Sequence, residues 1–224
     1  PSRTYQGMKF PGAPHGLKMA CGENPKRVYA QRGPATAMGN VAGWRGYFAQ
    51  GQEYLKRWKT WQEEGADPKK MPARDLEMES IAATLNGDIP AHWHCYRADE
   101  MVTAMDIARE FGFRIASFEH AVEAYKIRDY LRDSGICSLM WPDWWGFKLE
   151  AFDGIKENIA LVHAAGACAA LHSDDAQIGQ YLNLEAAKEV ARECVLRDLA
   201  WLDATVWGRG DLLGRAPSEA EPRS

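Results

Sequence analysis

Residues 89–112 read IPAHWHCYRADEMVTAMDIAREFG, and this stretch joins a short β-prone segment to a helical pattern. Residues 89–95 are mostly apolar and include two histidines, whereas residues 99–111 carry apolar side chains at helical spacing. Gly112 follows, at a position where glycine can take the left-handed conformation that ends many helices. The stretch therefore predicts a strand followed by a helix, with histidines at the carboxyl end of the strand.

The same pattern recurs along the rest of the chain. We expect further strands at 113–118, 136–141 and 167–172, and further helices at 121–133, 153–165 and 183–202. Gly135 and Gly166 end two of these helices as Gly112 ends the first. Strands that alternate with helices indicate βαβ units and a parallel sheet, which closes into a (β/α)8 barrel or forms an open doubly wound sheet.

The region before residue 89 is less regular. Residues 17–21 form a short apolar run that predicts a buried strand, followed by a turn at 22–25. Apolar and aromatic residues recur at roughly helical spacing from 35 to about 64, which predicts one long helix or two. We expect a loop at 65–72 and another helix at 74–86.

The composition is that of an ordinary globular protein. The 224 residues are 46% hydrophobic and carry a formal net charge of −4, with the basic residues scattered. This distribution gives neither a nucleic-acid footprint nor a polybasic membrane patch, so we expect a small molecule as the partner. The chain contains no apolar run of about 18 or more residues, so we expect no transmembrane helix.

The five cysteines are widely spaced and include no CxxC pair. They stand at Cys21, Cys95, Cys137, Cys168 and Cys194. This odd number and this spacing predict neither a disulfide framework nor a thiolate zinc site.

Polar side chains stand at most of the predicted strand ends. His94, His120 and Asp174 each follow or close a different strand, and their nitrogen and oxygen donors suit zinc. In a barrel the chemistry is located at the carboxyl ends of the strands. Three protein ligands with an open position define a catalytic site in which a metal-bound water is activated, so the residues indicate metal-assisted hydrolysis.

Several longer segments match a known group of proteins. They are IPAHWHCYRADEM, FGFRIASFEHAVEAYKIRDYL, WPDWWGFKLEAFDGIKENIALVHAAGACAALHSDD and YLNLEAAKEVA, with LKMACGENPKRVYA and PATAMGN upstream. Together they resemble the amidohydrolase superfamily, in particular the metal-dependent hydrolases grouped with imidazolonepropionase. The resemblance covers nearly everything from residue 16 to residue 202.

The resemblance implies a partial (β/α)8 TIM barrel in residues 1–202, with parallel strands corresponding to about strands four to eight of the family. It implies that His94 and His120 are metal ligands, and that Asp174 is both a ligand and the proton shuttle. Asp174 and His120 are accordingly the expected catalytic residues. The first strands and the flanking β-sandwich are absent, and we expect the family's first-strand His-x-His pair to precede residue 1.

Further residues have two open interpretations. Lys18 matches a strand-four lysine that is carboxylated and bridges two metals in some family members, but it could equally be an ordinary strand lysine. Tyr96 and Arg97 could bind a substrate, although Arg97 could instead pair with Asp99. Trp144 and Trp145 could contact an apolar substrate or only pack within their loop.

The leading functional hypothesis is a zinc-dependent or similar hydrolase of C–N bonds in amides, cyclic amides or dipeptide-like substrates. The alternative is a non-catalytic remnant or scaffold that lacks the first-strand ligands. Residues 203–224 depart from the family pattern, and their Pro, Ser, Glu and Arg composition predicts a disordered tail. An open sheet edge would favour self-association.

Overall fold

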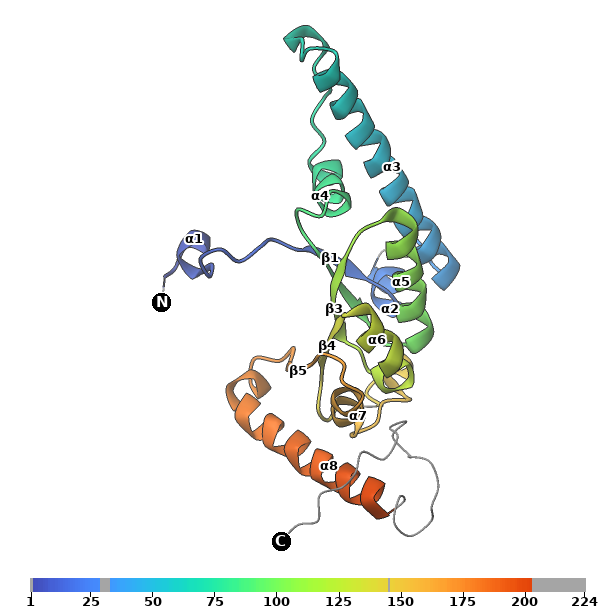
Figure 1. Cartoon of the computed structure of the whole chain (residues 1–224), viewed down its shortest axis with the longest axis vertical. Helices are drawn as coiled ribbons and strands as arrows, with labels where there is room; N and C mark the ends of the chain where they lie inside the picture. Colours follow the sequence, from blue (N-terminus) through green and yellow to red (C-terminus); the bar gives the residue numbers. More distant parts are fainter. Residues whose placement is uncertain (1, 29–32, 145, 203–224) are drawn as a thin grey trace.

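A computed structural model describes residues 2–28, 33–144 and 146–202 of the chain. Its centre is a five-stranded parallel sheet whose strands lie side by side in chain order (Figure 1). The strands are β1 (Leu17–Ala20), β2 (Ala91–Cys95), β3 (Ile115–His120), β4 (Cys137–Met140) and β5 (Ala169–Leu171). This parallel sheet with alternating helices is an α/β fold, as predicted, and it is consistent with part of a barrel.

Helices connect the strands and extend beyond them. They are α1 (Tyr5–Met8), α2 (Glu23–Val28), α3 (Ala37–Glu63), α4 (Leu76–Leu85), α5 (Ala98–Phe111), α6 (Arg128–Ser134), α7 (Asn158–Ala164) and α8 (Leu182–Leu202). Short 3-10 turns occupy Pro68–Lys70, Ala124–Ile127, Leu149–Ala151 and Ile178–Tyr181. Among the described helices, none is both long and apolar enough to cross a membrane.

Most predicted elements are present, with shifts at their ends. Gly112 and Gly135 end α5 and α6 in the left-handed conformation, with φ of 77° and 67°. The helix expected at 121–133 is instead a 3-10 turn followed by α6, and α7 begins only at Asn158. The turn expected at 22–25 was wrong, because α2 begins at Glu23 and accommodates Pro25 in its first turn.

One face of the sheet is the apolar core. Trp93 and Phe118 are fully buried on this face, where the Trp93 ring meets Trp44 of α3 edge-on at 5.0 Å between centroids. Phe48 of α3 stacks on Phe113 at 4.2 Å. Helices α3 and α4 extend away from the sheet as a pair (Figure 1). Successive residues of a strand point to opposite faces, so the neighbours of Trp93, His92 and His94, face the other side.

The described residues include two disulfides, so the expectation of no disulfide framework was wrong. Cys21 and Cys95 are 74 positions apart in sequence but follow neighbouring strands, with 5.1 Å between their Cα atoms. Cys137 and Cys168 lie side by side on β4 and just before β5, with 4.5 Å between their Cα atoms. Parallel pairing creates both contacts, and spacing along the sequence does not reveal them.

Within the described residues, β1 and β5 each pair with one neighbour only, so both outer edges of the sheet lack a partner strand. The side chain of Lys18 on β1 is 61% exposed. Residues 203–224, where a disordered tail was predicted, lie outside the described residues, so the boundary at 202 stays a prediction.

We predict that the 224-residue chain associates with itself through these edges. Unpaired backbone N–H and C=O groups at a sheet edge favour pairing with another chain. Light scattering after size-exclusion chromatography, over a dilution series, should therefore give a mass above that of one chain that falls on dilution. A single monomeric species at every concentration would contradict this prediction.

Candidate metal centre

The carboxyl ends of β2, β3 and β5 carry the three predicted ligands at one edge of the sheet, although their donor atoms do not all lie within 4.8 Å of one another. The ring centroids of His94 and His120 are 4.4 Å apart, and Nε2 of His120 lies 3.9 Å from Oδ2 of Asp174. These residues come from three separate segments of the chain, as the parallel sheet requires. The backbone is strained here, because His120, Ala121 and Asp174 all have positive φ, at 71°, 40° and 50°.

His120 is held by a second histidine that the sequence interpretation did not include among the site residues. Nδ1 of His120 lies 2.8 Å from Nε2 of His172, and the two rings are 4.8 Å apart. Because its Nδ1 is engaged in this way, His120 can direct Nε2 toward Asp174. Metal-binding histidines usually have such a partner on the second ring nitrogen.

Burial keeps the two candidate imidazoles neutral. The relative exposure of His94 is 7% and that of His120 is 5%. Burial, with the positive charges of Lys148 and Lys18, lowers the pKa of His94 to about 4. Burial also holds the pKa of His120 far below its usual value. Neutral imidazole is the form that binds metals, so this donor set fits a divalent cation.

Asp174 differs from the two histidines in its exposure. Its side chain is 58% exposed, so its carboxylate is accessible to solvent while one oxygen faces His120. The next residue, Asp175, accepts hydrogen bonds from the backbone N–H groups of Gln177 and Ile178, at 2.8 and 2.7 Å. Asp175 therefore caps the turn that follows, and Asp174 remains available as a ligand.

Lys18 lies in a polar network on the same face of the sheet. Its ammonium pairs with Glu119 of β3, and Ser117 donates a hydrogen bond to the other Glu119 oxygen at 2.7 Å. His92 joins the network through Nδ1, which lies 2.8 Å from the Ser117 hydroxyl. In this arrangement Lys18 is engaged as a cation, whereas carboxylation requires the neutral amine, so its bridging role stays a prediction.

Aromatic side chains line one side of the centre. The Trp141 ring stacks on His120 at 4.2 Å, and Tyr96 packs beside His94 at 4.7 Å. Trp144 lies 5.1 Å from Trp141, so it belongs to the same aromatic group. Trp145, the fourth predicted substrate contact, lies outside the described residues.

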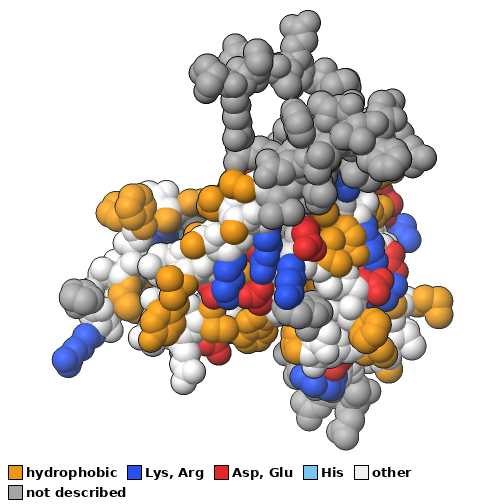
Figure 2. Space-filling view, turned by 90° about the horizontal axis from the view of Figure 1, so that it is seen from below, with side chains coloured by type: hydrophobic (Ala, Val, Ile, Leu, Met, Phe, Trp, Pro, Cys, Tyr) orange, Lys and Arg blue, Asp and Glu red, His pale blue; other side chains and the backbone are white. Residues whose placement is uncertain are grey.

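The loop that carries Trp141 and Trp144 is tied to α8 by charged side chains. Arg192 donates to the carbonyl of Pro142 at 2.9 Å and to Oδ1 of Asp143 at 2.6 Å, and Lys188 pairs with the same carboxylate. Basic and acidic side chains also lie close together across the face drawn in Figure 2. The ion pairs fix the aromatic loop against the last described helix.

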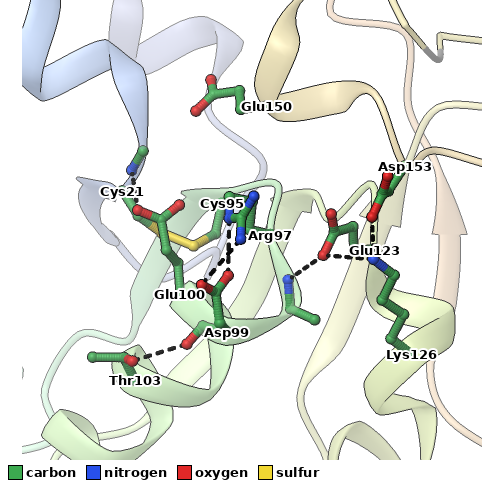
Figure 3. Close-up of polar contacts among 12 residues, drawn as sticks. Cys21, Cys95, Arg97, Asp99, Glu100, Thr103, Glu123, Lys126, Glu150 and Asp153 are labelled. Carbon is green, nitrogen blue, oxygen red and sulfur yellow. Dashed lines mark hydrogen bonds and ion pairs between the residues drawn. A yellow bond between two sulfur atoms is a disulfide. The ribbon is translucent and has the colours of Figure 1, made fainter. Parts of the chain in front are cut away.

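Arg97 takes the second of its two predicted roles. Its guanidinium binds Asp99 through two hydrogen bonds, of 3.0 and 3.3 Å (Figure 3). The bond to Asp99 and the carboxylate charge together raise the pKa of Arg97. A role in binding substrate stays a prediction for Arg97.

Two asparagines support the centre from outside the predicted set. The Asn24 side-chain nitrogen lies 3.2 Å from Nε2 of His94. Asn158, at the start of α7, is 3% exposed; it donates to the carbonyl of Ala121 at 2.9 Å and accepts from the N–H of Tyr125 at 2.8 Å. The strand pattern gave no signal for either asparagine, whereas His172 stood in the predicted strand end.

Comparisons with known proteins agree with the α/β fold. No family model matches the chain. An amidohydrolase, tasK, from Hapsidospora irregularis is 28% identical over 232 residues, which cover 96% of this chain and 23% of that protein. A crystal structure of an amidohydrolase from Thermotoga maritima is 37% identical, with a TM-score of 0.73, over 86% of this chain and 51% of that one.

These similarities support a relationship between the chain and the amidohydrolase superfamily. The chain spans about a quarter of the Hapsidospora relative and about half of the Thermotoga protein. Both relatives carry the name amidohydrolase, whereas the narrower kinship with imidazolonepropionase stays a prediction.

We predict that Asn158→Ala lowers the free energy of unfolding by roughly 1–3 kcal/mol, because it leaves the N–H of Tyr125 without its acceptor and removes one of the two donors to the carbonyl of Ala121. Urea unfolding followed by circular dichroism would measure this change. Asn183→Ala, on an exposed part of α8, is the matched control and should change stability by less than about 0.5 kcal/mol. Equal effects of the two substitutions would contradict the role assigned to Asn158.

Proposed function

We propose that the chain contributes to a metal-dependent hydrolase that cleaves C–N bonds in amides, cyclic amides or dipeptide-like substrates. The observation that carries the proposal is that the His120 side chain lies beside both His94 and Asp174. Two neutral imidazoles and a carboxylate form a donor set of the kind found in catalytic zinc sites. Zinc is therefore the proposed metal, held by these three residues.

A divalent metal at this position would lower the pKa of a bound water and polarise a substrate carbonyl. His120 is held in position by His172 on one side and covered by Trp141 on the other. The exposed carboxylate of Asp174 can accept a proton from water and deliver it to a leaving amine. Asp174 is thus the proposed general base and general acid.

Tyr96 and the aromatic loop are the proposed substrate contacts. Burial raises the pKa of Tyr96, so its hydroxyl stays protonated and can donate a hydrogen bond to a carbonyl. The Lys148 ammonium lies 4.3 Å from the centre of the Tyr96 ring and adds a positive charge at this side. Trp144 offers an apolar surface beside it, which suits an apolar acyl or side-chain group.

We predict that purified protein hydrolyses members of a panel of N-acyl amino acids, cyclic amides and dipeptides when zinc is added, and that a chelator abolishes turnover. Release of free amine would be the measurement. Bound zinc without turnover of any panel member would reject the catalytic proposal and favour the alternative, a non-catalytic scaffold.

We also predict that His94→Ala and Asp174→Ala each weaken zinc binding by at least about tenfold. Equilibrium dialysis followed by elemental analysis, with the disulfides left oxidised, would measure binding at this centre alone. His163→Ala is the matched control, because His163 lies on α7 and pairs with Glu193 at 3.2 Å. Undiminished binding in His94→Ala would show that the metal is not held here.

A further inference from the structure

A second group of metal-binding side chains lies next to the proposed centre. Ligand atoms of Cys21, Cys95 and Glu100 all lie within 4.8 Å of one another. Figure 3 shows the Glu100 side chain beside the bond that joins the two sulfur atoms. The three residues come from the ends of β1 and β2 and from the first turn of α5.

This group faces away from His94. Cys95 directly follows His94, so alternation along β2 directs the two side chains to opposite faces of the sheet. Cys21 and Cys95 are both fully buried, in the same core cluster as Trp93. The backbone N–H of Cys21 donates to the carbonyl of His94 at 2.8 Å, which fixes the two strand ends together.

The negative charge of the Glu100 carboxylate has few nearby groups that stabilise it. Oε1 accepts a hydrogen bond from the N–H of Gly22 at 3.2 Å, whereas Oε2 is buried and accepts none. Burial raises the pKa of Glu100, and the charge of Lys26 only partly opposes this. A disulfide offers neither a charge nor a hydrogen-bond donor to a buried carboxylate, so it does not account for the position of Glu100.

We propose that Cys21 and Cys95, when reduced, bind a divalent thiophilic metal such as zinc together with Glu100, and that the disulfide is the metal-free oxidised form of this site. Two thiolates and one carboxylate are established types of zinc ligand. The cation would supply the positive charge that the buried Glu100 oxygen lacks. This metal site does not depend on the proposed hydrolase function.

The chemistry balances with a small dithiol as reductant. The dithiol gives two electrons and two protons to the Cys21–Cys95 bond, which opens to two thiols while the dithiol closes to a cyclic disulfide. Binding of the metal then displaces the two thiol protons to solvent. A disulfide reagent would reverse the sequence and release the metal.

The second cysteine pair provides a matched control. Cys137 and Cys168 are also joined and also lie on neighbouring strands. In the part of the chain that the structure describes, however, no group of three donors within 4.8 Å of one another includes Cys137 or Cys168, whereas Glu100 completes such a group with Cys21 and Cys95. The two cysteine pairs therefore differ in that Glu100 accompanies Cys21 and Cys95.

Cobalt(II) titration of the dithiol-reduced protein tests the proposal, since Co²⁺ occupies zinc sites with lower affinity and thiolate ligation gives an intense sulfur-to-metal absorption. We expect this absorption at one equivalent, its loss on adding Zn²⁺, and its absence in the oxidised protein. The histidine and aspartate ligands of the other centre do not produce it, so failure of one site is distinguishable from failure of the other.

Three variants assign the signal. Cys95→Ser should abolish the absorption, Glu100→Gln should weaken Co²⁺ binding by at least about tenfold, and the double variant Cys137→Ser with Cys168→Ser should retain it. Circular dichroism would verify that each variant folds. If Cys95→Ser does not fold, Glu100→Gln still tests the site, because it retains both sulfurs. Absence of sulfur-to-cobalt absorption in the folded, reduced protein, or its persistence unchanged in Glu100→Gln, would overturn the proposal.

Discussion

The structure depends on the parallel pairing of five strands in register. Pairs such as Lys18 with His92, and His94 with Glu119, set each strand against its neighbour. Since all strands run in one direction, their carboxyl ends meet at one edge of the sheet. Residues separated by up to 80 positions, such as His94 and Asp174, thereby lie at the same edge of the sheet. Every chemical property proposed for the chain follows from this alignment.

Much of the fold could be predicted from the sequence, because the information is local. Apolar periodicity located the strands, and Gly112 and Gly135 located helix ends by their left-handed backbone. The site could be predicted only in part. The strand ends drew attention to His94 and His120, but the partnership of His120 with His172 depends on register and on positive φ, which no local pattern encodes.

The errors share a physical cause. The Cys21–Cys95 and Cys137–Cys168 contacts arise between strands, so their separation along the chain is uninformative. Arg97 was not an error, since its pairing with Asp99 was one of two interpretations left open; that pairing depends on the geometry of the first turn of α5. The position of Glu100 beside two sulfurs is likewise a tertiary property. At the end of β2, the sulfur of Cys95 and the imidazole of His94 therefore lie on opposite faces of the sheet.

The left-handed backbone at Ala121 has a consequence for how this sequence can change over evolution. A fully buried alanine at φ 40° costs stability, which glycine at the same position would recover in part. Glycine would also give the segment after His120 more freedom, so the imidazole would be less firmly oriented. Selection for a more stable fold and selection for a fixed orientation of the His120 imidazole therefore act against each other at this position.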